Sequence, residues 1–193
     1  MIANCAAVIM AGGDSRRMGQ DKANLVLGER TLLQSVAATL QPLFPEVVVS
    51  VRQPRPEIEL LQVCDDPAHN GPLAGLAAAL ERATTQWIFI VACDMPFITP
   101  AVIEYLASQR AEYQAVVPVV GGHPQPLAAF YAKECLDEVR ACLHGKGKHS
   151  FRALLDTMRV CYVSEAQMQA VDPQLRSFFD LDTPQDFQAA QNR

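Results

Sequence analysis

The chain has 193 residues with a formal net charge of −5, and 50% of them are hydrophobic while 19% are charged. This composition indicates a globular protein with a sizeable core and argues against a disordered chain. The acidic balance disfavours nucleic acid as a partner, and no apolar run reaches the length of a membrane span. Because no basic leader precedes the first apolar run, we expect a cytoplasmic location and no membrane partner.

Helix and strand signals alternate along the chain. This pattern predicts an α/β fold, a single Rossmann-like three-layer domain over 1–193, with a mostly parallel sheet and helices on both faces. The expected strands cover 5–10, 47–51, 60–63, 87–92, 115–120, 127–131, 160–163 and 178–179. The expected helices begin after Thr31, at Pro72, after Thr99, at Lys133, after Ser150 and after Thr183.

The loop behind the first strand has the residue types of a phosphate site. It reads MAGGDSRRMGQDK over 10–22, with glycines at 12 and 13 and cationic side chains at Arg16, Arg17 and Lys22. Glycines let backbone N–H groups approach an anion, and arginine and lysine match its charge. Neither GxxxxGK(S/T) nor GxGxxG occurs here, so the two most familiar phosphate loops are excluded.

Acidic residues follow two later segments that we expect to end at the same edge of the sheet. Asp94 comes directly after the strand 87–92, and Asp180 and Asp182 follow the apolar pair Phe178-Phe179. A carboxylate at the carboxyl end of a strand can reach a metal beside a bound ligand. For Asp182 a second interpretation stays open, because it could instead cap the helix that begins at Thr183-Pro184.

These motifs resemble a nucleotidyltransferase family, the MobA-like family of molybdenum cofactor guanylyltransferases. Residues 10–22 resemble its LAGGxSxRMGxDK loop, and Cys93-Asp94-Met95-Pro96 resembles its CDxP motif. The resemblance implies transfer of GMP from GTP to the phosphate of molybdopterin, with release of pyrophosphate and with Mg²⁺ as cofactor. It further implies contacts with molybdoenzymes or cofactor-delivery proteins.

The same resemblance implies roles for individual residues. The backbone of Ala11, Gly12 and Gly13 would bind the triphosphate, Arg16 and Lys22 would be catalytic, and Lys22 would also bind the nucleotide. Asp94 would contact both nucleotide and metal, and Asp182 would be the second metal ligand.

Two further segments extend the expected nucleotide site. Asp66 with Gly71-Pro-Leu-Ala-Gly75 resembles the family's D…GPLAG segment, which implies nucleotide contacts by Asp66 and Gly71. Ser50 stands near the position where relatives carry a nucleotide-binding Asn. The loop 121–127 resembles one on the acceptor side.

Other functions remain open at this point. A cytidylyltransferase acting on the same pterin is one alternative, although its members tend to carry Ala-Ala-Gly where this chain has Ala11-Gly12-Gly13. A sugar-1-phosphate nucleotidyltransferase is another, but such chains usually have an added carboxyl-terminal segment. An alternative from a different class is a nucleotide-binding adaptor subunit without turnover.

Overall fold

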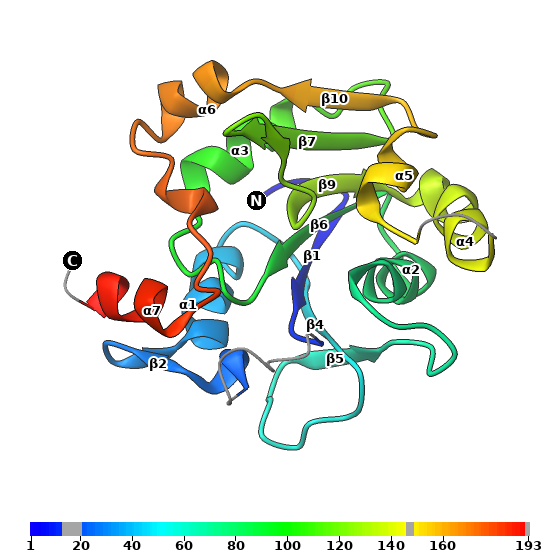
Figure 1. Ribbon diagram of the computed structural model, residues 1–193. Helices are drawn as coiled ribbons and strands as arrows, with labels where there is room; N and C mark the ends of the chain where they lie inside the picture. Colours follow the sequence, from blue (N-terminus) through cyan, green and yellow to red (C-terminus); the bar gives the residue numbers. More distant parts are fainter. Residues whose placement is uncertain (13–20, 146–148, 192–193) are drawn as a thin grey trace.

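A computed structural model describes residues 1–12, 21–145 and 149–191 of the chain. Within these residues, eight strands form the main sheet, seven of them in the order β10–β7–β9–β6–β1–β4–β5, and β8 pairs with β7 (Figure 1). The strands are β1 (Cys5–Met10), β4 (Val47–Val51), β5 (Leu61–Cys64), β6 (Trp87–Ala92), β7 (Ala115–Val120), β8 (His123–Pro124), β9 (Ala128–Ala132) and β10 (Val160–Val163).

The sheet is mostly parallel, as the sequence predicts. Strand β1 pairs in parallel with both β4 and β6, so the carboxyl ends of these three strands meet at one edge. Strand β9 runs antiparallel to β6 and β7, and it therefore brings its amino end to that edge. The Ala92 N–H donates to the Leu127 carbonyl at 2.9 Å, which fixes the loop before β9 beside the end of β6.

Helices cover both faces of the sheet (Figure 1). One face carries α1 (Leu32–Leu40), α3 (Pro100–Ser108) and α6 (Glu165–Val171), and the other carries α2 (Pro72–Arg82), α4 (Leu136–His144) and α5 (Phe151–Leu155). Successive residues of a strand point to opposite faces, so Ile9 packs in the hydrophobic layer under α1, α3 and α6, and Val8 packs in the layer under α2, α4 and α5. Both layers exclude water from the strands, which explains their continuous apolar sequences.

Local capping chemistry sets where several helices begin. Thr31 caps α1 in a reciprocal box with Gln34, in which each side chain accepts a backbone N–H of the other residue. Thr99 and Ser150 cap α3 and α5 through their hydroxyl oxygens. These three caps confirm the helix starts that the sequence predicts.

The carboxyl-terminal helix α7 (Pro184–Gln191) packs on the hairpin of β2 (Val26–Leu27) and β3 (Arg30–Thr31). The centre of this third hydrophobic cluster is formed by Leu32 and Leu181, which are fully buried. Leu181 thereby fixes the segment that carries Asp180 and Asp182 against the rest of the protein. The short hairpin itself has no counterpart among the strands expected from the sequence.

One expected strand is wrong. Residues 178–179 do not form a strand, because η3 (Arg176–Phe178) is a 3₁₀ helix. The Asp172 carboxylate accepts the Ser177 N–H at 2.8 Å, and Leu175 adopts a left-handed conformation, so the chain turns where an aromatic pair suggested extension. The sequence analysis also omits α6, although Ser164 and Gln167 form a capping box at its start.

In the part of the chain that the structure describes, no helix combines the length and the apolar character needed to cross a bilayer.

Candidate active site

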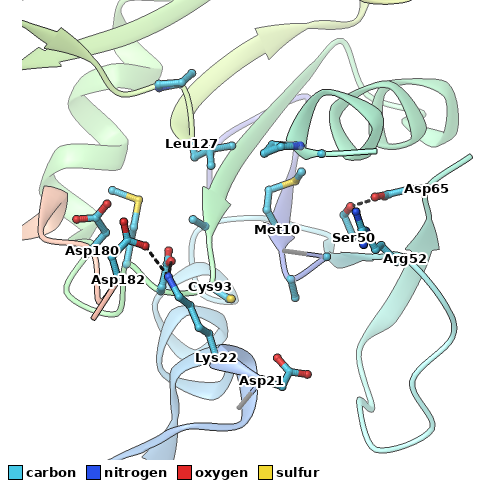
Figure 2. A pocket seen from close by; sticks show the side chains of 18 of the residues that line it. Met10, Asp21, Lys22, Ser50, Arg52, Asp65, Cys93, Leu127, Asp180 and Asp182 are labelled. Atoms are coloured by element: carbon cyan, nitrogen blue, oxygen red, sulfur yellow. Dashed lines mark hydrogen bonds and ion pairs between the residues drawn. The ribbon is translucent and has the colours of Figure 1, made fainter. Parts of the chain in front are cut away.

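A pocket of about 670 Å³ lies at the carboxyl ends of β1, β4 and β6. Figure 2 shows Lys22, Asp180 and Asp182 on one side of it and Ser50, Arg52 and Asp65 on the other. We call the first group, with Asp94, the lysine end, and the second group, with Asn70, the serine end. The pocket thus joins a strongly charged region to a polar one across an apolar floor that includes Met10.

The lysine end is organised around one ammonium group. Lys22 Nζ donates to Asp94 Oδ2 at 2.7 Å and to Asp182 Oδ1 at 2.5 Å. The side chains of Lys22 and Asp94 are only 17% and 16% exposed, whereas Asp182 is 47% exposed. Two carboxylates from distant parts of the sequence therefore converge on a single cation position.

A backbone hydrogen bond holds the segments of these two carboxylates side by side. The Leu181 N–H donates to the Asp94 carbonyl at 2.9 Å, which ties the segment before Asp182 to the end of β6. The cap of α7 is Thr183, whose hydroxyl accepts the Asp186 N–H while the Asp186 carboxylate accepts the Thr183 N–H. Asp182 is therefore not the helix cap, and its carboxylate faces Lys22 instead.

Lys22 itself is anchored through its neighbour. Asp21 caps η1 (Lys22–Asn24) and also pairs with Arg55, with 2.6 Å between Arg55 Nη2 and Asp21 Oδ2. Gln62 of β5 exchanges side-chain hydrogen bonds with the backbone of Arg55, each 2.8 Å long. Arg55 thereby connects the turn that carries Lys22 to the sheet.

Electrostatics at the lysine end favour a charged lysine. Burial alone would lower the pKa of Lys22, but the hydrogen bonds to Asp182 and Asp94 raise this pKa above its usual value. Burial and the nearby charge of Asp182 raise the pKa of Asp180. Among the described residues that line this end, three carboxylates lie around one ammonium group, so the arrangement favours a cation at this position.

The serine end is built by β4, by the loop after β5 and by the start of α2. The buried Ser50 hydroxyl donates to Asp65 Oδ1 at 3.0 Å, and Arg52 Nη2 donates to Asn70 Oδ1 at 3.1 Å. Burial raises the pKa of Asp65, against the hydrogen bond from Ser50 and the positive charge of Arg52. This end can offer both acceptors and donors to a bound ligand.

Two glycines lie close to side chains of the serine end. A Cβ atom on Gly12 would lie 3.4 Å from Asp65 Oδ2, and one on Gly75 would lie 2.6 Å from Ser50 Oγ and 2.4 Å from Met10 Cε. Gly71, at the start of α2, has a φ of 93°, a conformation that glycine adopts readily. Gly75 therefore leaves the space that the side chains of Met10 and Ser50 occupy, and Gly12 and Gly71 line the pocket.

Asp65 lines the pocket, whereas Asp66, which the sequence analysis selected, is not among the lining residues. Asp66 is exposed, and its carboxylate accepts the Ala68 N–H within a turn, whereas Asp65 lines the pocket. The pairing of β5 with β4 explains the difference. The Asp65 N–H donates to the Val51 carbonyl, and this hydrogen bond extends β5 by one residue. Val63 packs against α2, and Asp65, two residues further, faces the same side.

The remaining wall of the pocket comes from the loop before β9. Gln125, Pro126 and Leu127 line it, together with Met95 from the loop after β6. His123 is exposed within β8 and is not among the lining residues. This wall belongs to the segment 121–127 that the sequence analysis assigned to an acceptor.

Comparison with known proteins decides the family. The family model described as "MobA-like NTP transferase domain" matches residues 7–161. The chain belongs to this MobA-like family. It is therefore a nucleotidyltransferase, as the sequence analysis inferred from residues 10–22 and 93–96.

Named relatives agree with this assignment. A probable molybdenum cofactor guanylyltransferase of Pelotomaculum thermopropionicum is 39% identical over 183 residues, which cover 93% of this chain and 88% of that protein. A molybdenum cofactor guanylyltransferase of Syntrophotalea carbinolica is 33% identical, over 95% of this chain and 89% of that one. The crystal structure of molybdopterin-guanine dinucleotide biosynthesis protein A from Archaeoglobus fulgidus superimposes with a TM-score of 0.86 at 27% identity, and 97% of each chain is covered.

In this MobA-like transferase the structure brings together seven of the residues that the sequence analysis assigned to the nucleotide or the metal. The residues that line the one pocket are Ala11, Gly12, Lys22, Ser50, Gly71, Asp94 and Asp182. Gly13 and Arg16 lie outside the described residues, so their expected roles stay predictions. Arg52, Asp65 and Asn70 were missed, and the alternation of buried and exposed residues along β5 is the signal that could have identified Asp65.

The lysine end has the chemistry of a magnesium site. Within residues 1–12, 21–145 and 149–191, no group of three or more His, Cys, Asp or Glu side chains is placed to hold a metal. Mg²⁺, however, commonly binds to one or two carboxylates and completes its shell with waters and substrate phosphates. Asp94 and Asp182, which already share one cation, fit that requirement.

Cys93 precedes Asp94 and lines the pocket, yet it has no nucleophilic character. Burial raises the pKa of its thiol to about 12, so the thiolate is not formed at neutral pH. Cys93 is therefore not a candidate nucleophile of this pocket.

Proposed function

We propose that this protein transfers GMP from GTP to the terminal phosphate of molybdopterin and releases pyrophosphate. The observation that carries the proposal is the convergence of Lys22, Asp94 and Asp182 beside Gly12, in a pocket whose other end holds Ser50 and Asp65. Membership of the MobA-like family and the names of its relatives support the choice of GTP and molybdopterin. Residues 1–193 would act as one unit, in the cytoplasm.

In the reaction, an oxygen of the acceptor phosphate attacks the α-phosphorus of GTP, a new P–O bond forms, and the bond to the β-phosphate breaks. The acceptor oxygen is already anionic at neutral pH, so no general base is required. Catalysis then consists of positioning and of charge neutralisation. Ala11 and Gly12 would orient the triphosphate, and Lys22 would neutralise charge that develops at the α-phosphate.

Asp94 and Asp182 would hold Mg²⁺ through their carboxylates. The metal, when bound, neutralises phosphate charge and favours departure of pyrophosphate. Asp65, together with Ser50, would accept hydrogen bonds from the nucleoside part of GTP. The wall formed by Gln125 and Leu127 would contact the acceptor.

The decisive experiment incubates the protein with MgGTP and molybdopterin and detects the dinucleotide by mass. Formation of the guanine dinucleotide with equimolar pyrophosphate supports the proposal. Product from CTP alone would identify a cytidylyltransferase. GTP binding without pyrophosphate from any acceptor would favour the adaptor function.

Two variants test the assigned residues. Lys22→Ala and Asp94→Ala should each lower turnover by roughly two orders of magnitude or more, because the first removes a cation that neutralises phosphate charge and the second removes a ligand that would hold Mg²⁺. Circular dichroism and thermal unfolding would verify that the variants fold. Turnover near that of the wild type in either variant would remove that residue from the mechanism.

A further inference from the structure

The position of Lys22 has a consequence beyond its expected contact with phosphate. Its ammonium group lies between Asp94 and Asp182, at 2.7 and 2.5 Å from their oxygens. These are the two carboxylates that the proposed function assigns to Mg²⁺. A lysine side chain therefore sits where the metal would have to bind.

We propose that Lys22 serves as the resident counter-ion of this metal site in the nucleotide-free protein, so that a divalent cation enters together with the triphosphate. This inference rests on the proposed metal roles of Asp94 and Asp182. Two cations cannot share the same pair of oxygens without strong repulsion at close range. The ammonium must move away from the carboxylates for the metal to take its place.

The triphosphate gives the ammonium another anionic partner. Lysine is a point charge on a long flexible stem, so its ammonium can exchange carboxylate oxygens for phosphate oxygens while the backbone stays in place. The backbone at Lys22 is fixed, because Asp21 both caps η1 and pairs with Arg55. Lys22 would thus couple occupation of the phosphate site to occupation of the metal site.

The arrangement also explains why two or three carboxylates can lie together before the metal arrives. Asp180 lines the same end of the pocket as Asp94 and Asp182. Without Lys22 the carboxylates of Asp94, Asp180 and Asp182 would repel one another more strongly, and they would bind another cation more tightly. Removal of the lysine should therefore strengthen metal binding in the absence of nucleotide, although the same change weakens catalysis.

The test measures Mn²⁺ binding to the nucleotide-free protein by isothermal titration calorimetry and by electron paramagnetic resonance. We expect Lys22→Gln to bind Mn²⁺ about tenfold more tightly than the wild type, because one competing charge is lost at a partly buried site. Arg140→Gln is the matched control. It also removes one positive charge, but Arg140 lies on α4 in an exposed ion pair with Glu81 of α2, and the change should leave the Mn²⁺ affinity within about twofold.

A second measurement covers the stability of the variant. In EDTA, Lys22→Gln should unfold at a lower temperature than the wild type, and Mn²⁺ alone should raise its melting temperature more than it raises that of the wild type. In the double variant Lys22→Gln/Asp182→Asn, both the gain in Mn²⁺ affinity and the larger rise in melting temperature should be absent. Equal Mn²⁺ affinity in the wild type and Lys22→Gln would refute the counter-ion role.

The outcomes separate this inference from the transferase proposal. If the wild type makes the dinucleotide and Lys22→Gln gains no Mn²⁺ affinity, the counter-ion role alone is wrong. If Lys22→Gln gains affinity and no acceptor yields product, the counter-ion role stands and the transferase proposal is wrong.

Discussion

The substitution Gly75→Ala probes how tightly the serine end is built. The added methyl group would lie 2.4 Å from Met10 Cε and 2.6 Å from Ser50 Oγ, both far inside normal contact distance. Met10 can bend its flexible end away, but Ser50 is buried within β4 and can only turn its hydroxyl from Asp65. The substitution should therefore break the hydrogen bond between Ser50 and Asp65.

The magnitude follows from three terms. Overpacking a core costs about 1–3 kcal/mol, and a lost hydrogen bond to a charged group costs about 1.5–3 kcal/mol. Alanine is favoured over glycine in a helix by up to about 1 kcal/mol, which offsets part of this loss. We expect the free energy of unfolding to fall by roughly 2–4 kcal/mol, with weaker GTP binding.

Urea unfolding followed by circular dichroism measures the first effect, and calorimetric titration with GTP measures the second. Ser50→Ala provides the control, because it removes the hydroxyl that the new methyl group would meet. In the Ser50→Ala background, Gly75→Ala should cost about 1–2 kcal/mol less than in the wild type. A Gly75→Ala protein as stable as the wild type, with unchanged GTP affinity, would refute this account of the serine end.

Four further predictions concern single side chains. Asp65→Asn should weaken GTP binding about tenfold or more, whereas Asp66→Asn should leave GTP affinity unchanged; equal effects in a titration would contradict the assignment of Asp65. Burial raises the folded-state pKa of Asp65, so the stability that this group contributes is lost as pH rises through that pKa. At neutral pH, therefore, Asp65→Asn should not reduce the free energy of unfolding measured in urea. Ser50→Ala removes a hydrogen bond that lowers the pKa of Asp65, and the acidic decline of GTP affinity should therefore move to higher pH in titrations. Arg55→Ala should lower kcat about tenfold by loosening the turn that carries Lys22, and Arg55→Lys should restore part of it; unchanged kcat would deny Arg55 a positioning role.

Much of the fold could be predicted because local and global signals agree. Thr31 and Thr99 cap helices where the sequence places them, and the apolar runs 5–10 and 87–92 are central strands. Their carboxyl ends are neighbours in a parallel sheet, which is why Lys22 and Asp94 meet although they are 72 residues apart. The parallel pairing of the strands therefore determines which loops meet at the site.

The rest depends on details that periodicity does not contain. Two adjacent acids follow β5, and only the one-residue extension of the ladder decides that Asp65 faces the pocket. The pair Phe178-Phe179 has a strong strand signal, but a side chain of Asp172 draws the preceding backbone into a 3₁₀ turn. Arg55 supports Lys22 through an ion pair with Asp21, and no local pattern marks such a long-range contact.

The reversed direction of β9 has a practical consequence for engineering. The segment 121–127 turns back from β7 into β9 and lines the pocket at Gln125–Leu127, while β1, β4 and β5 build the opposite side without it. A substituted loop of different length or composition at 121–127 would alter one side of the pocket and leave the connections between β1, β4 and β5 on the other side intact. Libraries that vary this wall of the pocket should therefore be confined to residues 121–127.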